Sequence, residues 1–310
     1  MERLTVSSSP HIRHEDSSKG IMLDVIIALL PITVAACIMY GWYSVLLVLV
    51  TVATAVLSEY ICCKIMKRQN SIFDLSAVVT GLILAMNLPP ELPLWMAAIG
   101  SVIAIVVVKM MFGGIGHNFA NPAITARIAL LVSFPKAMTD WVAPTGAEVI
   151  TGATDATSMA TPLTTDGYSY TQLFMGQVPG SLGETFKLLI ILAFLYLVFR
   201  RVISPIIPVT IVGTVALMSV IFGLDPLYTI LSGGLLFGAV FMATDYVTSP
   251  INWKGHIIFG VGIGVITMII RLWGAYPEGM SFAILLMNAV TPLINKYVKP
   301  RRFGVITAKK

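Results

Sequence analysis

Long apolar runs recur along almost the whole chain, and they limit what it can fold into. A membrane-spanning helix needs about 20 largely apolar residues, and the 310-residue sequence contains many such stretches. Its residues are 57% hydrophobic and 11% charged, whereas an ordinary soluble domain has about a quarter charged residues. These values exclude a soluble fold, so we expect most of the chain to be helix inside a lipid bilayer.

Hydropathy predicts an all-α integral membrane protein with about ten transmembrane helices. They form two five-helix groups on either side of one long external loop, and an even number of spans leaves both termini on the same side. The predicted spans are residues 21–40, 42–62, 73–88, 93–112, 119–134, 185–200, 204–223, 227–243, 256–273 and 280–297.

The spans divide the chain into five regions. Two helical repeats are flanked by short polar ends and separated by a hydrophilic loop that is rich in Thr, Ser, Gly, Asp and Pro. The regions are a cytoplasmic N-terminal segment (1–20), the first repeat (21–134), the external loop (135–184), the second repeat (185–297) and a basic cytoplasmic tail (298–310).

The distribution of basic residues predicts the orientation. With cytoplasmic termini, most of the 20 Lys and Arg residues fall in cytoplasmic segments, and the outer side keeps only Lys136, Lys187 and Arg271. This asymmetry follows the positive-inside rule and predicts a multi-pass protein of a bacterial or archaeal inner (cytoplasmic) membrane. The net charge of +5 then reflects orientation and contact with anionic lipid, and we expect no nucleic-acid partner.

The two halves share sequence features that indicate an inverted repeat. Thr80–Pro89 is followed by Asn121–Thr125 in the first half, and Ser232–Leu236 is followed by Asn288–Pro292 in the second. Five spans on each side of the loop make the halves enter the membrane from opposite faces. Such repeats commonly hold a ligand near the midplane, where broken helices expose backbone groups.

Helix-breaking residues mark the candidate ligand site. They cluster around Gly113, Gly114, Asn118 and Asn121, and again in 243–250. These positions are candidates for binding a ligand. The alternative is that the glycines serve only tight turns and helix packing.

Ionisable residues at membrane depth are costly and are often functional. Asp245 follows a broken segment and is a candidate for contacting an ion or a ligand, and Arg127 is a candidate for the same role or for a structural ion pair. Asp24, Glu59, Asp74 and Asp225 lie near predicted span ends, where we expect solvent to reach them. Cys37, Cys62 and Cys63 have no metal-binding spacing, and no metal-ligating or catalytic residue is assigned.

One motif in the external loop points to a covalent cofactor. The segment 155–163 reads Asp-Ala-Thr-Ser-Met-Ala-Thr-Pro-Leu. It resembles the flavin-attachment motif, Asp-x-x-Ser/Thr-Gly-Ala-Thr, of the NqrB/RnfD family, which comprises the D component of the Rnf electron-transport complex and the related B component of the sodium-pumping NADH:quinone oxidoreductase. The resemblance implies FMN bound to Thr161 through a phosphoester, attached by a flavin transferase that uses FAD, with Asp155, Ser158 and Ala160 completing the motif.

The motif departs from the family pattern at Met159, where the family usually has Gly. A methionine does not readily reach the φ > 0 conformations that glycine adopts. The upstream sequence 151–154 also ends in Gly-Ala-Thr, so Thr154 is a rival attachment site; Glu148 stands there in place of the Asp, and no Pro-Leu follows. Thr161 is the preferred site.

Four further segments resemble the same family and follow in family order: 112–123, 180–185, 242–250 and 275–281. Tyr246 replaces a usual Pro. Only about twenty residues precede the first span, which favours the RnfD branch of the family over the quinone-reducing one because the latter has a longer N-terminal extension.

The resemblance implies a flavin-carrying membrane component of a ferredoxin:NAD oxidoreductase that couples electron transfer to Na+ or H+ export. It also implies a second, noncovalent riboflavin, which we expect near Gly113, Gly114, Asn118 and Asn121. Expected partners are the other Rnf proteins, including the G-like flavoprotein and the C-like NAD-binding protein. The alternatives are the NqrB component of the quinone-reducing complex, an inverted-repeat transporter or channel, and a structural scaffold.

Overall fold

Every regular element in the described part of the chain is a helix. The computed structural model describes residues 17–68, 71–142, 144, 163, 168–184, 186–274 and 278–299. Within these ranges three helices are long and apolar enough to cross a membrane: α1 (Ser18–Tyr40), α2 (Trp42–Ile65) and α12 (Trp253–Trp273). The prediction of an all-helical membrane protein is confirmed.

The first half of the chain contains two long helices followed by shorter ones. Helix is present at each predicted span, but the third and fourth spans are divided. The further elements are the 3-10 turn η1 (Ile72–Asp74), α3 (Ser76–Met86), α4 (Leu94–Val102), the π-helix η2 (Ile103–Met110), α5 (Pro122–Ser133) and the short α6 (Pro135–Met138).

The second half also has helix at each predicted span, and its third span is the most broken. The elements are α7 (Tyr170–Met175), the 3-10 turn η3 (Leu182–Glu184), α8 (Lys187–Phe199), α9 (Ile206–Ile221), α10 (Pro226–Leu231), α11 (Leu235–Phe237), the π-helix η4 (Gly238–Met242), then α12 and α13 (Met280–Tyr297).

Local sequence explains where α10 begins. Asp225 is its N-cap, because its carboxylate accepts hydrogen bonds from the backbone N–H groups of Leu227 (2.9 Å) and Tyr228 (3.3 Å), and Pro226 occupies the first helical position, where no N–H is needed. Tyr170 donates a further hydrogen bond to Asp225, which lowers the pKa of that carboxyl. Asp225 is therefore a helix cap, and it is exposed, as the sequence predicts for this span end.

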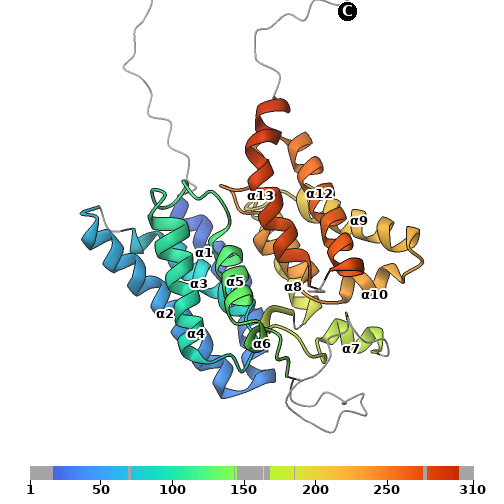
Figure 1. Ribbon diagram of the computed structural model, residues 1–310, viewed down its shortest axis with the longest axis horizontal. Helices are drawn as coiled ribbons and strands as arrows, with labels where there is room; N and C mark the ends of the chain where they lie inside the picture. Colours follow the sequence, from blue (N-terminus) through green and yellow to red (C-terminus); the bar gives the residue numbers. More distant parts are fainter. Residues whose placement is uncertain are drawn as a thin grey trace, which may run out of the picture.

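The two halves lie side by side. In Figure 1, α1 to α5 form one group and α8 to α13 the other, and α1 contacts α8 while α5 contacts α13. The start of α1 and the end of α13 lie at the upper edge of this view, and α6 and α7 lie at the lower edge. The contacts between halves therefore join helices at equivalent places in the two groups.

Close packing of α9 and α12 depends on two glycines one helical turn apart. A Cβ added at Gly260 would overlap Thr210 Oγ1, and one added at Gly264 would meet Thr214 Cβ at 2.7 Å. Small residues four apart let membrane helices approach closely and gain dispersion energy, because lipid provides no hydrophobic drive for the contact. The α9–α12 pair is a rigid part of the second half.

We expect Gly260→Ala to destabilise the protein by about 1–3 kcal/mol through overpacking. Gly213→Ala on α9 is the matched control, since a Cβ there meets nothing within 4 Å. Thermal unfolding of the detergent-purified protein checks this. Equal midpoint temperatures for the two variants contradict the assigned packing.

Candidate functional site

A cavity of about 390 Å³ lies between the two halves, among the described residues. Small-molecule sites in proteins are commonly about 300–1,000 Å³, so the cavity is large enough for an organic cofactor. Its walls are mostly apolar. In the first half they come from α1, α3, α5, η2 and the turn after η2, and in the second from α8, the turn after it, η4 and the turn after η4. Representative apolar lining residues are Met22, Val25, Val79, Ile83, Leu197 and Phe241.

The cavity lies toward the end of the helix bundle where α1 begins. Of the 23-residue α1, it is lined by Ser18, Ile21, Met22 and Val25, which belong to the first two turns. The sequence predicts a ligand near the membrane midplane, and that prediction stays open.

Three of the residues predicted from helix breakers meet at this cavity: Asn118, Asn121 and Asp245. Gly113 and Gly114 are not among its lining residues. They form the turn beside it, with φ values of 130° and 94° that only glycine adopts readily. Their conformation fits the alternative of a tight turn, and their predicted role in binding a ligand stays a prediction.

Asn121 joins the halves at the cavity. Its side-chain oxygen caps α5 by accepting from the backbone N–H groups of Ala123 (3.0 Å) and Ile124 (3.3 Å). Its amide nitrogen donates to the carbonyl of Met242, at the end of η4, over 3.1 Å.

Asn118 differs from Asn121, because its buried Oδ1 has no hydrogen-bond partner in the described part of the chain. An unpartnered buried acceptor at a cavity wall suits a ligand that donates an N–H.

Asp245 lies in the turn that follows η4. Its carboxylate accepts a hydrogen bond from Thr248 Oγ1 over 3.0 Å, which leaves further acceptor capacity at the cavity. Asp245 thus contributes negative charge to the wall formed by the second half.

Both π-helices border the cavity. The wider turn is seen in the bond from Met111 N to Val106 O in the first half (3.0 Å) and from Ala243 N to Gly238 O in the second (2.8 Å). Such i→i+5 segments are rare and are frequently found at functional sites. In this protein each π-helix changes the register of its helix just before the chain reverses direction. The hydropathy pattern of the sequence does not predict either π-helix.

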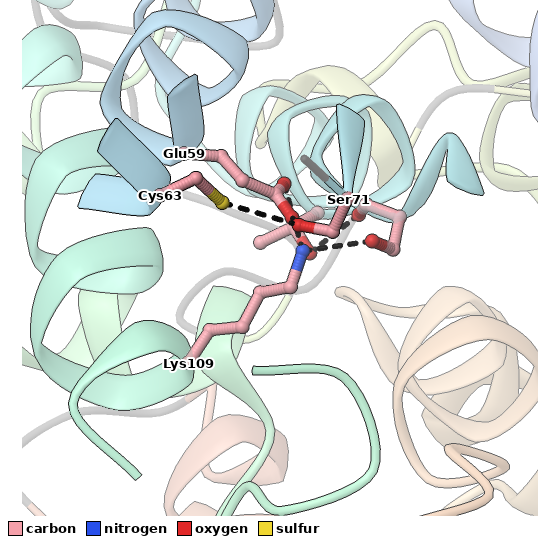
Figure 2. Close-up of polar contacts among 6 residues, drawn as sticks. Glu59, Cys63, Ser71 and Lys109 are labelled. Atoms are coloured by element: carbon pink, nitrogen blue, oxygen red, sulfur yellow. Dashed lines mark hydrogen bonds and ion pairs between the residues drawn. The ribbon is translucent and has the colours of Figure 1, made fainter. Parts of the chain in front are cut away.

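A buried ion pair joins a lining residue of the cavity, Lys109, to Glu59, which does not line it. Lys109 Nζ contacts Glu59 Oε2 at 2.8 Å, and the two side chains are 2% and 0% exposed. Lys109 also donates to Ser76 Oγ over 2.7 Å, and Ser71 donates to the other oxygen of Glu59. Figure 2 shows this cluster, with Cys63 beside Ser71.

The prediction that solvent reaches Glu59 is wrong. Glu59 lies on the inner face of α2, where Lys109 of η2, fifty residues later, neutralises its charge. Lys109 itself lines the cavity, although no motif in the sequence assigns it a role. Sequence spacing alone gives no signal for a pair so far apart.

Arg127 lies away from this cavity. It forms an ion pair with Glu278 and donates to Ser281 Oγ over 2.7 Å and to Asn87 Oδ1 over 3.3 Å. The bonds to Glu278 and Ser281 tie α5 to α13 and to the turn before it, as the predicted structural ion pair would. Asp24 similarly joins α1 to α8 by contacting Arg200 at 3.2 Å.

The flavin-attachment motif, with Thr161, Asp155, Ser158 and Ala160, lies outside the described residues. Leu163, just after the motif, is described and packs against Gly233: a Cβ built on Gly233 would lie 2.9 Å from Leu163 Cδ1. The Arg271 guanidinium lies at the same place, 3.4 Å from that point, and donates to the carbonyls of Thr229 (2.7 Å) and Ser232 (3.0 Å).

Lys187 adds a second buried cation to this region. Its Nζ donates to the carbonyls of Glu184 (2.5 Å) and Gly233 (3.0 Å). The Glu184 carboxylate is also buried, and it accepts from Ser181 Oγ over 2.9 Å. Two cations held by backbone carbonyls thus lie near the Glu184 carboxylate, which leaves the region around Gly233 electropositive.

The fold and the cavity define a class: a helical membrane protein with a cofactor-sized, apolar-walled cavity where two helical halves meet. The chain belongs to the NQR2, RnfD, RnfE family, whose model matches residues 5–304. The resemblance found in the sequence motifs is confirmed.

Relatives match over nearly their full length. The D component of a Na+-translocating ferredoxin:NAD+ oxidoreductase complex of Acetobacterium woodii is 45% identical, covering 99% of this chain and 97% of the relative. The D component of a proton-translocating ferredoxin:NAD+ oxidoreductase complex of Clostridium ljungdahlii is 42% identical, covering 97% and 96%. The D component of an ion-translocating oxidoreductase complex of Stutzerimonas stutzeri is 40% identical, covering 92% and 91%.

We expect Arg127→Gln to lower the stability of the protein by about 3–5 kcal/mol, because it leaves Glu278 without its buried partner. Asp24→Asn is the control: its partner Arg200 is 54% exposed, and such a pair contributes about 1 kcal/mol or less. Thermal unfolding in detergent measures both. Comparable losses in the two variants contradict the structural role of Arg127.

Proposed function

We propose that this chain is the flavin-carrying membrane component of an ion-translocating ferredoxin:NAD+ oxidoreductase (Rnf) complex, in which it relays electrons across the membrane. The observation that carries the proposal is the near full-length similarity to relatives named as the D component of such complexes. Those two relatives differ in the named ion, Na+ in one and H+ in the other, at 45% and 42% identity. The proposal therefore covers export of either cation.

The cavity supports a noncovalent flavin such as riboflavin. An isoalloxazine ring has an apolar end with methyl groups and a polar end with N–H donors and carbonyl acceptors. The apolar wall suits the first end. Asn118 Oδ1, buried and without a partner in the described residues, suits an N–H of the second, while Lys109 and Ser76 provide donors. Bound there, the flavin would supply one- and two-electron redox chemistry that no side chain provides.

The second proposed cofactor is FMN on Thr161, on the outer side. The Thr161 hydroxyl would attack the FMN phosphorus of FAD in the active site of a flavin transferase, breaking the bond to AMP and giving its proton to a base of that enzyme. AMP leaves with the second phosphate. The neighbours Ser158 and Ala160 have small side chains, which suits access by that enzyme.

Electrostatics near the loop supports that attachment. The phosphodiester of a tethered FMN is an anion, and Leu163, two residues after Thr161, packs beside Arg271. Lys187 holds a second positive charge next to Gly233. Buried cations near the anchor of the loop favour an anionic group there, and sequence spacing alone gives these two residues no role in binding.

The proposed membrane arrangement is ten spans in two inverted five-helix repeats, 21–134 and 185–297, with the termini in the cytoplasm of a bacterial or archaeal cell. Two observations support it. The contacts α1–α8 and α5–α13 join equivalent helices of the halves, and the start of α1 and the end of α13 lie opposite α6 and α7 (Figure 1). Ferredoxin and NAD+ would then bind other proteins of the complex, such as the C-like and G-like ones.

We expect Thr161→Ala to remove the covalent flavin. With the flavin transferase coexpressed, the denatured wild-type chain should fluoresce on a gel under ultraviolet light, and the variant should give no band. Thr154→Ala is the matched control and should keep the band. If fluorescence survives Thr161→Ala but not Thr154→Ala, the attachment site is Thr154. If the wild-type chain does not fluoresce, the alternative of a transporter is favoured.

We expect Asn118→Leu to reduce retention of noncovalent flavin by about tenfold, since it removes one buried acceptor at nearly constant side-chain size. Asn288→Leu is the control: the side-chain atoms of Asn288 are also buried and have no partner in the described residues, but they do not line the cavity. Acid-released flavin per purified chain measures both. Equal flavin content in the two variants contradicts the assignment of the cavity.

A further inference from the structure

The Lys109–Glu59 pair needs an explanation beyond stability. Removing two charges from water costs several kcal/mol for each ion, and buried pairs are often no more stabilising than apolar residues of the same volume. This pair is nearly inaccessible, with side chains 2% and 0% exposed. Fold stability alone is therefore a weak reason for its presence.

The pair has a direction with respect to the cavity. Lys109 and Ser76 are lining residues and Glu59 is not. Glu59 lies behind them, where Ser71 donates to it and Cys63 Sγ lies 3.6 Å from Ser71 Oγ. The positive member of the pair thus belongs to the cavity lining, and the negative member does not. Figure 2 shows the contact between them.

Lys109 also has donor capacity left for an occupant. An ammonium group has three N–H donors, and the described residues take two of them, through Glu59 Oε2 at 2.8 Å and Ser76 Oγ at 2.7 Å. Ser76 accepts the bond from Lys109, so its own hydroxyl proton can point to an acceptor in the cavity.

Three helix N-termini add to the same field. α1 begins at Ser18, α3 at Ser76 and α5 at Pro122, and all three residues line the cavity. The N-terminus of a helix carries a partial positive charge. Together with Lys109, these helix ends make the first-half wall of the cavity electropositive, and Asp245 of the second half is the acidic residue among the lining residues.

From this geometry we infer that Lys109 sets the redox potential of the cavity flavin, with Glu59 holding it in place and partly offsetting its charge. The inference rests on the proposed function. Electrons add negative charge to the flavin, and a fixed cation at the wall favours that form over the oxidised one in a medium of low dielectric constant. Lys109 forms or breaks no bond in this role, so it acts through its charge.

The test is the midpoint potential of the noncovalent flavin in the purified, flavinylated complex. The double variant Lys109→Gln with Glu59→Gln keeps the hydrogen-bonding ability of both side chains at similar size and removes both charges. We expect its equilibrium constant for flavin reduction to fall at least tenfold, which corresponds to about 30 mV for a two-electron couple. Glu59→Gln alone removes the offsetting charge, and we expect it to move the potential in the opposite direction.

Two controls separate charge from structure. Lys64→Gln removes an exposed charge on the same helix as Glu59, and Ser71→Ala removes a hydrogen bond to Glu59 without changing charge; we expect both to keep the wild-type potential. An unchanged potential in the double variant, or shifts of the same sign in the double variant and in Glu59→Gln, overturns the inference.

The outcome also distinguishes failure of the inference from failure of the proposed function. If the wild-type complex releases no noncovalent flavin on acid treatment, the proposed occupant of the cavity is wrong. If it releases flavin and the double variant binds flavin with an unaltered potential, only the role of Lys109 is wrong. If the double variant binds no flavin, Glu59→Gln alone tests the role of Lys109. A higher flavin potential in that variant supports the role, and a lower or unchanged potential overturns it.

Discussion

The Asn121 side chain satisfies backbone groups of both halves at the place where the helices break. In a bilayer each unpaired backbone group costs several kcal/mol, so a chain that leaves the helix inside a membrane protein needs internal partners. Asn121 accepts from two N–H groups at the start of α5 and donates to the carbonyl of Met242 at the end of η4. Through this residue the broken segments can border a cavity without losing their hydrogen bonds.

The same constraint shows what could be predicted from the sequence. The helical class and the position of each helix follow from apolar length, because lipid permits few other structures. Asn118, Asn121 and Asp245 could be found from helix breakers, because such residues mark chain reversals. The π-helices could not, since a change from i→i+4 to i→i+5 bonding leaves the composition of the helix unaltered.

The buried ion pair was missed for a different reason. Glu59 and Lys109 each stand near the end of a hydrophobic run, which is also where solvent-exposed charges stand. Only packing of α2 against η2 decides between the two environments, and it depends on contacts fifty residues apart. Arg127 illustrates the opposite case. A charge in the middle of a predicted span is costly without a partner, so an ion pair could be predicted, and the partner is Glu278.

The cavity is built from residues that are distant in the chain, and this has a consequence for biogenesis. Its lining begins at Ser18 and ends at Val247, so the wall is incomplete until most of the chain has been synthesised and inserted. A ribosome-bound first half can fold its long helices but offers no enclosed volume. Binding of the proposed flavin at this position would therefore be a late event that follows insertion of the second half.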